Sequence, residues 1–316
     1  MSGRFKTVTI IGAGTMGHGI ALVLARAGID VFLTDLNDEI LGKAKELIRS
    51  HLQTLAEGEG GGEDPATVLK RITLTTDYKA GAKRSDLVVE AIIEDTEAKR
   101  KLFNELSTVL KEPTIVASNT SYLDIFPLAP EKLQERLVIT HYFNPPYVVP
   151  LVEIVGSDKT NPMIPGQVGD WLKSIGMVAV VLKKFVPGFI VNRLQRAIGR
   201  EVLYMIDEGF AEPEEIDRAV KASLGVRTPI LGVVARYDFA GLDMAVRALK
   251  APSIGLASEE RMSPTLVKLV EQGHLGVKSG KGFFDYSDKP LSTVLKERDI
   301  KLIQVRKLLR ELGEIQ

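Results

Sequence analysis

The chain has 316 residues, of which 45% are hydrophobic and 26% are charged, proportions typical of a soluble globular protein long enough for two domains. Basic and acidic residues number 41 each, so net charge gives no reason to expect nucleic acid or an anionic membrane as a partner. The absence of cysteine excludes disulfides, thiolate metal sites and thiol nucleophiles, and we predict no metal site. No apolar run approaches the roughly 20 residues of a membrane span. The N-terminus also lacks a basic leader, so we expect a cytoplasmic protein.

Short β-branched runs alternate with helical patterns in the first half of the chain. Helices are predicted from the glycines after residue 11 to about Ala27, and at 38–57, 96–111 and 163–174. Strands separated by helices favour a parallel sheet covered on both faces. The stretch EGEGGGEDP at 57–65 is too polar and glycine-rich for a core, and we interpret it as a mobile loop. Strands are predicted at 7–11, 30–34, 71–74, 86–91, 114–118, 136–140, 150–155 and 179–182.

The pattern changes at VPGFIVNR (186–193), after which only helical periodicity is visible. We therefore predict an α/β domain over residues 1–185 and an all-α domain over residues 186–316. The last predicted helix carries an apolar stripe, whose default explanation is packing against its own domain or a partner. The helices of this half are predicted at 189–208, 213–222, 241–249, 264–271 and 290–312.

The segment IIGAGTMGHG carries the spacing G-x-G-x-x-G between a predicted strand and a predicted helix. Such a turn lets backbone N–H groups and a helix N-terminus approach a pyrophosphate. Asp35 ends the second strand, where a carboxylate accepts hydrogen bonds from ribose hydroxyls and repels a 2′-phosphate, which favours NAD over NADP. The alternative is a simple turn and a helix-capping aspartate. The predicted contacts in the turn are Gly12, Gly14, Thr15, Met16 and Gly17.

Polar side chains follow three later strands, where ligands gather in open α/β sheets. Oxidation of an alcohol requires a base, and the imidazole of His141 has a suitable pKa. Glu153 would hold the other ring nitrogen, and Ser121 and Asn192 would meet the reacting oxygen. Each residue has a structural alternative: a histidine after a strand, an edge charge, or the turn and helix cap of SNTS.

Seven motifs resemble the 3-hydroxyacyl-CoA dehydrogenase family: GAGTMGHGIA, DLVVEAIIED, ASNTS, HYFNP, LVEIV, PGFIVNR and GKGFFDY, in the family's order from about residue 6 to 286. The resemblance implies a Rossmann-type domain followed by a helical domain that usually pairs into a homodimer. It implies that His141 is the base, that Glu153 is its partner, and that Ser121 and Asn192 position the substrate oxygens. It also implies that NAD lies along Asp35, Glu94, Lys99, Asn119 and Asn144.

Three departures from the family pattern concern the substrate. Members that act on CoA thioesters tend to have lysines near the end of the second helix, where this chain has acids at 57, 59, 63 and 64. The forms NPPY and GVRTP look more like the branch of gulonate dehydrogenase (lambda-crystallin) and carnitine dehydrogenase, whose substrates are free 3-hydroxy acids. Arg227 would then clamp the carboxylate. Its structural alternative is an ion pair at the surface or an interface.

The resulting prediction is an NAD-dependent dehydrogenase of fatty acid metabolism. It would oxidise the 3-hydroxyl of a short 3-hydroxyacyl-CoA, such as 3-hydroxybutyryl-CoA, to the 3-keto product. One alternative is the oxidation of a free 3-hydroxy acid bound through Arg227. An alternative of another class is a non-catalytic NAD-binding or structural protein. The expected partners are a small-molecule substrate and a second copy of the chain, bound through the helical domain.

Overall fold

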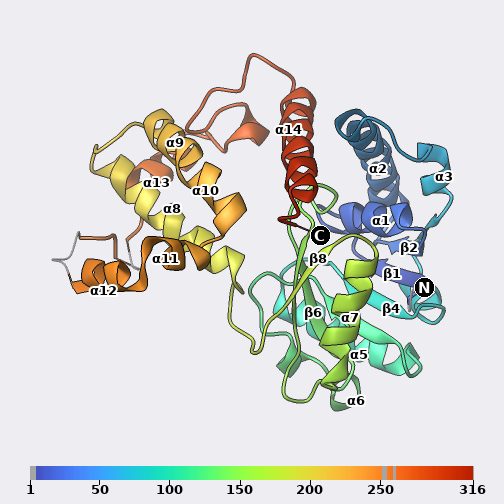
Figure 1. The fold of residues 1–316 in the computed structure, drawn as a ribbon. Helices are drawn as coiled ribbons and strands as arrows, with labels where there is room; N and C mark the ends of the chain where they lie inside the picture. The colour runs from blue at the N-terminus through green and yellow to red at the C-terminus, as the bar shows by residue number, and fades with distance from the viewer. Residues whose placement is uncertain (1–4, 251–254, 259–260, 316) are drawn as a thin grey trace. The chain divides into compact units, whose positions relative to one another are not determined.

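The computed structural model describes residues 5–250, 255–258 and 261–315 (Figure 1). The chain forms two compact units. The sheet unit contains the residues up to Ile190 together with Asp299–Arg310, and the helical unit contains Val191–Arg298 and Glu311–Glu314. The Rossmann-type α/β fold followed by helices is confirmed. The finer division at 185/186 stays a prediction, because a segment near the C-terminus belongs to the sheet unit.

An eight-stranded sheet forms the centre of the first unit, in the order β3-β2-β1-β4-β5-β6-β7-β8. All eight strands were predicted to within two residues at either end. The expectation of a fully parallel sheet fails at one pair, because β6 and β7 are antiparallel. No helix separates these two strands, so the chain turns straight back. The strands are β1 (Thr7–Ile11), β2 (Asp30–Thr34), β3 (Ile72–Thr75), β4 (Leu87–Glu90), β5 (Ile115–Ser118), β6 (Leu137–Tyr142), β7 (Leu151–Val155) and β8 (Val178–Val181).

Helices cover both faces of this sheet, and successive strand residues feed two separate cores. Ile10 of β1 belongs to the core that includes residues of α1 (Gly17–Arg26), α2 (Asp38–Glu59) and α7 (Met163–Ser174). Ile11 belongs to the core that includes Phe103 of α5 (Thr96–Val109). Shorter elements complete the unit: α3 (Pro65–Leu69), α4 (Tyr78–Ala82), η1 (Phe126–Leu128) and α6 (Glu131–Gln134).

Less of the segment 57–65 is loop than its composition suggested. Helix α2 continues to Glu59 and ends at Gly60, whose φ of +78° suits glycine. Two of the acids in this segment pair with arginines. Arg26 binds Glu59 at 2.7 Å, and Arg71 binds Glu63 with two hydrogen bonds of 2.6 and 2.7 Å. The predicted loop is therefore shorter than expected and is confined to residues 60–64, between α2 and α3, and its mobility stays a prediction.

Helix α14 (Leu291–Glu311) brings the C-terminal region back to the sheet unit (Figure 1). Its Ile303 is fully buried in the same core as α1 and α2. A Cβ placed on Gly58 of α2 would lie 3.0 Å from the Ile303 side chain, so the two helices meet closely there. Arg306 adds an ion pair of 2.7 Å to Glu59. Ile303 and Arg306 therefore explain why residues 299–310 belong to the first unit, whereas Leu302 and Val305 of the predicted stripe are exposed.

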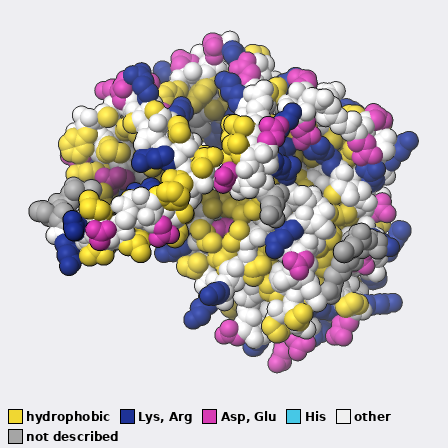
Figure 2. All heavy atoms as spheres, viewed as in Figure 1, with side chains coloured by type: hydrophobic (Ala, Val, Ile, Leu, Met, Phe, Trp, Pro, Cys, Tyr) yellow, Lys and Arg dark blue, Asp and Glu magenta, His cyan; other side chains and the backbone are white. Residues whose placement is uncertain are grey.

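The helical unit exposes much apolar surface. Within the described residues, α8, α10, α11, α12 and α13 contain no buried side chain. Val234 is 80% exposed and Phe239 is 77% exposed, and Figure 2 shows hydrophobic side chains at the surface of these helices. None of the described helices combines the length and apolar character that a membrane crossing requires. The helices are α8 (Val191–Asp207), α9 (Pro213–Ala222), α10 (Leu224–Leu231), α11 (Ala235–Ala240), α12 (Leu242–Lys250) and α13 (Pro264–Glu271), with η2 (Val277–Ser279).

Candidate active site

The glycine-rich turn between β1 and α1 has the geometry of a phosphate cradle. Gly12 has a φ of +102°, and a Cβ there would lie 2.4 Å from the carbonyl oxygen of Ala91. A Cβ on Gly17 would lie 1.7 Å from the Gly12 oxygen, whereas one on Gly14 meets no protein atom within 4 Å. The turn is thus tightly packed against protein backbone at Gly12 and Gly17 and open at Gly14. Residues of this turn therefore fit a dinucleotide phosphate at the start of α1.

Asp35 lies beside this turn, at the end of β2. Its Oδ2 accepts a hydrogen bond of 2.6 Å from the Ala13 N–H, and its Oδ1 accepts one of 2.7 Å from the Leu36 N–H. The carboxylate is therefore held against the turn, in the position that suits a ribose. Thr15 is exposed and Met16 is half-buried in the same turn.

Sequence reasoning missed Glu90, a fully buried carboxylate at the end of β4. Its Oε1 accepts hydrogen bonds from Lys99 Nζ at 2.6 Å and from the Ile92 N–H at 2.9 Å. Its Oε2 accepts one from Ser118 Oγ at 2.5 Å. An acid that ends an apolar strand requires a cation nearby, and Lys99 on the next helix was the available signal. The ammonium of Lys99 is itself buried between carboxylates.

Glu94 connects the end of β4 to the turn after β5. Its Oε1 accepts hydrogen bonds from Thr120 Oγ1 at 2.6 Å and from the Ser121 N–H at 2.8 Å, and its Oε2 lies 3.3 Å from Lys99 Nζ. Burial alone would raise the pKa of Glu94, but these hydrogen bonds and the lysine charge outweigh it and hold the pKa below its usual range. Glu94 is therefore an anion that orders the turn bearing Ser121.

A histidine–carboxylate pair lies on adjacent antiparallel strands. His141 of β6 is directly opposite Glu153 of β7, so both side chains project from the same face. His141 Nδ1 lies 3.1 Å from Glu153 Oε2, and the two residues are 4% and 1% exposed. The other oxygen, Oε1, accepts a hydrogen bond of 2.9 Å from the Ile190 N–H. Phe143 and Phe189 flank the imidazole ring, with centroids 4.5 and 5.1 Å away.

This pair has the chemistry of a base with its orienting partner. A carboxylate on Nδ1 favours the tautomer with the proton on that nitrogen and stabilises the imidazolium ion. In that tautomer, Nε2 is the ring atom that carries the lone pair. The strand was predicted to end at residue 140, but it continues through His141, which gives the pair its fixed register.

The other predicted site residues divide between the two units. Asn119 follows β5, and its Oδ1 accepts a hydrogen bond of 2.9 Å from the Tyr142 N–H beside His141. Asn144 is exposed just after β6. Asn192 lies in the first turn of α8, and Arg227 lies on α10, both in the helical unit. Arg227 donates to Ser223 Oγ at 2.6 Å and has no carboxylate partner among the described residues.

Comparison with known proteins covers nearly the whole chain. The model of the 3-hydroxyacyl-CoA dehydrogenase NAD-binding domain matches residues 7–185, and that of the C-terminal domain of the same family matches residues 188–286. A 5-formyl-3-hydroxy-2-methylpyridine 4-carboxylate 5-dehydrogenase of Mesorhizobium japonicum is 32% identical, over 96% of this chain and 98% of that protein. A probable 3-hydroxybutyryl-CoA dehydrogenase of Deinococcus radiodurans is 38% identical, over 88% of this chain and 99% of that protein.

Solved structures give the same two kinds of relative. A 5-formyl-3-hydroxy-2-methylpyridine 4-carboxylic acid 5-dehydrogenase, described as an NAD⁺-dependent dismutase, superposes with a TM-score of 0.86 at 30% identity, over 97% of this chain and 99% of that one. An (S)-3-hydroxybutyryl-CoA dehydrogenase of Ralstonia eutropha superposes with a TM-score of 0.70 at 33% identity, over 90% of this chain and 99% of that one.

Proposed function

This chain belongs to the 3-hydroxyacyl-CoA dehydrogenase family and carries its NAD-binding domain, and we propose that it oxidises a substrate hydroxyl with His141 as the base. The observation that carries this proposal is the buried 3.1 Å contact between His141 Nδ1 and Glu153 Oε2. Nε2 of His141 removes the hydroxyl proton, and Glu153 stabilises the imidazolium that results. Ser121 and Asn192, as groups that hold the substrate oxygens, are part of the same proposal.

The cofactor in this proposal is held by the turn and strand ends described above. Gly12, Gly14 and Gly17 admit the pyrophosphate, with Thr15 and Met16 in the same turn, and Asp35 receives the ribose. NAD, when bound, accepts a hydride from the carbon that bears the hydroxyl. Further proposed contacts along the cofactor are Glu94, Lys99, Asn119 and Asn144.

A short 3-hydroxyacyl-CoA is the first candidate substrate. Relatives named 3-hydroxybutyryl-CoA dehydrogenase support it, including proteins of Deinococcus radiodurans and Bradyrhizobium diazoefficiens. Ion pairing also weakens the argument against it: Glu59 and Glu63 are both bound by arginines, so they repel a CoA phosphate less than their sequence suggested. The product would be the 3-keto thioester.

A free hydroxy acid is the second candidate, and two observations favour a substrate with a free carboxylate. Arg227 lacks a carboxylate partner among the described residues, so its fork of donors suits a substrate carboxylate. The Mesorhizobium relative, named for a pyridine carboxylate substrate, matches 96% of this chain, compared with 88% for the Deinococcus relative.

Initial rates of NAD reduction distinguish these candidates. The purified protein is offered (S)-3-hydroxybutyryl-CoA and a panel of free hydroxy acids that includes gulonate and carnitine. The carboxylate clamp is supported if the protein oxidises a free acid, if Arg227→Ala abolishes this activity, and if Arg218→Ala keeps it. Arg218 is a suitable control because it is an exposed arginine of α9, the helix before α10, and it pairs with Glu215 of its own helix. Tight NAD binding without turnover of any substrate would support a non-catalytic role instead.

We also propose that the protein is a cytoplasmic homodimer that pairs through its helical unit. The exposed Val234 and Phe239 and the helices without buried side chains support a partner surface. Light scattering should give about twice the chain mass of 34.6 kDa. A monomer at micromolar concentration would contradict the pairing.

A further inference from the structure

A recess in the sheet unit lies outside the proposed active site. It has a volume of about 360 Å³, within the range of about 300–1,000 Å³ that small-molecule sites occupy. The C-terminal end of α1, the loop 146–150, the start of β8 and helix α14 all contribute to its wall. None of the residues proposed above for NAD or substrate lines it.

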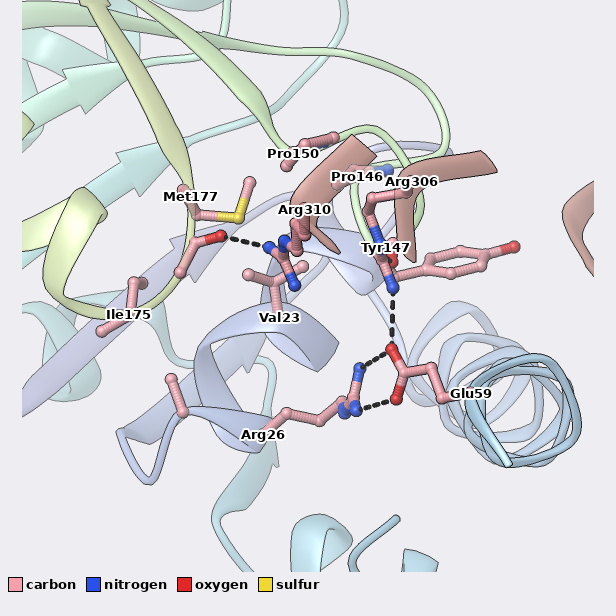
Figure 3. Close-up of a pocket in the computed structure, with 12 residues that line it drawn as sticks. Val23, Arg26, Glu59, Pro146, Tyr147, Pro150, Ile175, Met177, Arg306 and Arg310 are labelled. Atoms are coloured by element: carbon pink, nitrogen blue, oxygen red, sulfur yellow. Dashed lines mark hydrogen bonds and ion pairs between the residues drawn. The ribbon is translucent and has the colours of Figure 1, made fainter. Parts of the chain in front are cut away.

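Charge in this recess is unbalanced. Three guanidiniums, of Arg26, Arg306 and Arg310, line it together with one carboxylate, that of Glu59. Figure 3 shows Arg26 and Arg306 reaching the same carboxylate from different helices. Arg310 donates to the carbonyl oxygen of Gly176 at 2.8 Å and has no carboxylate partner among the described residues. Two of the three cationic charges are therefore left without a matching acid in the recess.

Arg306 lies deep in the recess, with a side chain that is 12% exposed. Burial lowers its pKa, and the charges of Arg310 and Arg26 oppose protonation further, while Glu59 favours it. A bound anion would relieve the repulsion between the guanidiniums. Arginine donors also bind phosphate oxygens in pairs.

The remaining wall is apolar. The lining includes four apolar side chains, which are labelled in Figure 3: Val23, Pro150, Ile175 and Met177. A wall of this kind contacts an organic body rather than a bare ion. We propose that the recess binds a small organic phosphate monoester, with the phosphate on Arg310 and Arg306 and the organic group on the apolar wall.

Phenyl phosphate is a suitable probe, because it combines a phosphate monoester with a small apolar group. Thermal unfolding is measured with saturating NAD, so that the dinucleotide turn does not bind the probe, and with NaCl at equal ionic strength as the reference. At ten times its dissociation constant the probe should raise Tm by about 3 °C. Inorganic phosphate should give a smaller increase, and an equal one would overturn the role of the apolar wall.

Two variants of α14 locate the effect. Arg310→Gln should abolish the increase, whereas Lys307→Gln, an exposed cation on the same helix that does not line the recess, should retain it. An equal increase in Arg310→Gln, or none in the wild type, would overturn the proposal. In the wild-type protein the probe should also protect Arg310 from phenylglyoxal, as measured by peptide mass spectrometry. Unchanged modification would overturn it as well.

Discussion

Glu153→Gln tests the proposed mechanism with a change of almost no volume. Both carboxylate oxygens of Glu153 accept hydrogen bonds, from Ile190 N–H at 2.9 Å and from His141 Nδ1 at 3.1 Å. A glutamine has one acceptor oxygen, and the Ile190 amide is a donor that cannot change its role. The amide oxygen should therefore face Ile190, which turns the NH₂ group toward His141. Nδ1 must then accept, so the ring proton moves to Nε2, which can no longer act as a base.

The expected loss of turnover follows from this change of tautomer. General bases contribute about 10²–10⁴-fold to rate, and the variant also removes the anion that stabilises the imidazolium. We expect kcat to fall about 10³-fold, equivalent to about 4 kcal/mol of transition-state stabilisation. The dissociation constant of NAD should change less than about threefold, because Glu153 is not among the proposed cofactor contacts. Initial rates and NAD titrations measure the two quantities.

An exposed glutamate provides the control. Glu97→Gln removes one partner of a surface pair with Arg100 on α5, where such pairs contribute at most about 1 kcal/mol. It should leave kcat unchanged. If Glu153→Gln kept kcat within about threefold of the wild type, the tautomer argument would be refuted and His141 would not be the base that the proposal requires.

Three further variants or conditions test other parts of the structure. Asp35→Ala should weaken NAD binding about 10–100-fold and raise activity with NADP relative to NAD, since hydrogen bonds to a charged group contribute about 1.5–3 kcal/mol; an unchanged ratio of kcat/KM would contradict the ribose assignment. Burial lowers the pKa of His18 below its ordinary value of 6.5, and a hydrogen bond to Gly14 opposes this shift only in part. Between the two pKa values the folded state therefore binds fewer protons than the unfolded state. Stability should therefore decrease as pH falls through that window, and denaturant midpoints at pH 7.5 and 5.0 should differ less in His18→Gln. Ile303→Ala should cost about 2–5 kcal/mol in the free energy of unfolding, whereas Val305→Ala, at a residue that is 50% exposed, should cost at most about 0.5 kcal/mol.

The strands could be predicted because their residues are β-branched and form short runs. The direction of β7 was missed, although the lack of a predicted helix between β6 and β7 was a signal for an antiparallel pair. His141 and Glu153 were identified through their family resemblance, but their facing positions depend on the antiparallel register of β6 and β7. The separation of twelve residues between His141 and Glu153 does not by itself show that they face each other across two strands.

Ion pairs bear on two of the errors. Composition predicted a loop over all of 57–65, but α2 continues to Glu59, whose carboxylate binds Arg26 and Arg306 from 33 and 247 positions away. Glu90 was missed although Lys99, the cation beside it, lies only nine positions further along the chain. Side chains whose roles depend on distant partners are the part of this molecule that a local pattern cannot predict.

The return of α14 affects how the protein is made. Glu59 and Arg306, which form one ion pair in the sheet unit, are 247 positions apart. At about 5–20 residues per second, the ribosome needs on the order of ten seconds to proceed from β8 to the end of α14. During that interval the newly made sheet lacks the Ile303 side chain that fills its core beside Gly58. A premature stop before Ile303 would leave every proposed catalytic and cofactor residue in the chain and remove this side chain and its ion-pairing neighbour Arg306 from the sheet unit.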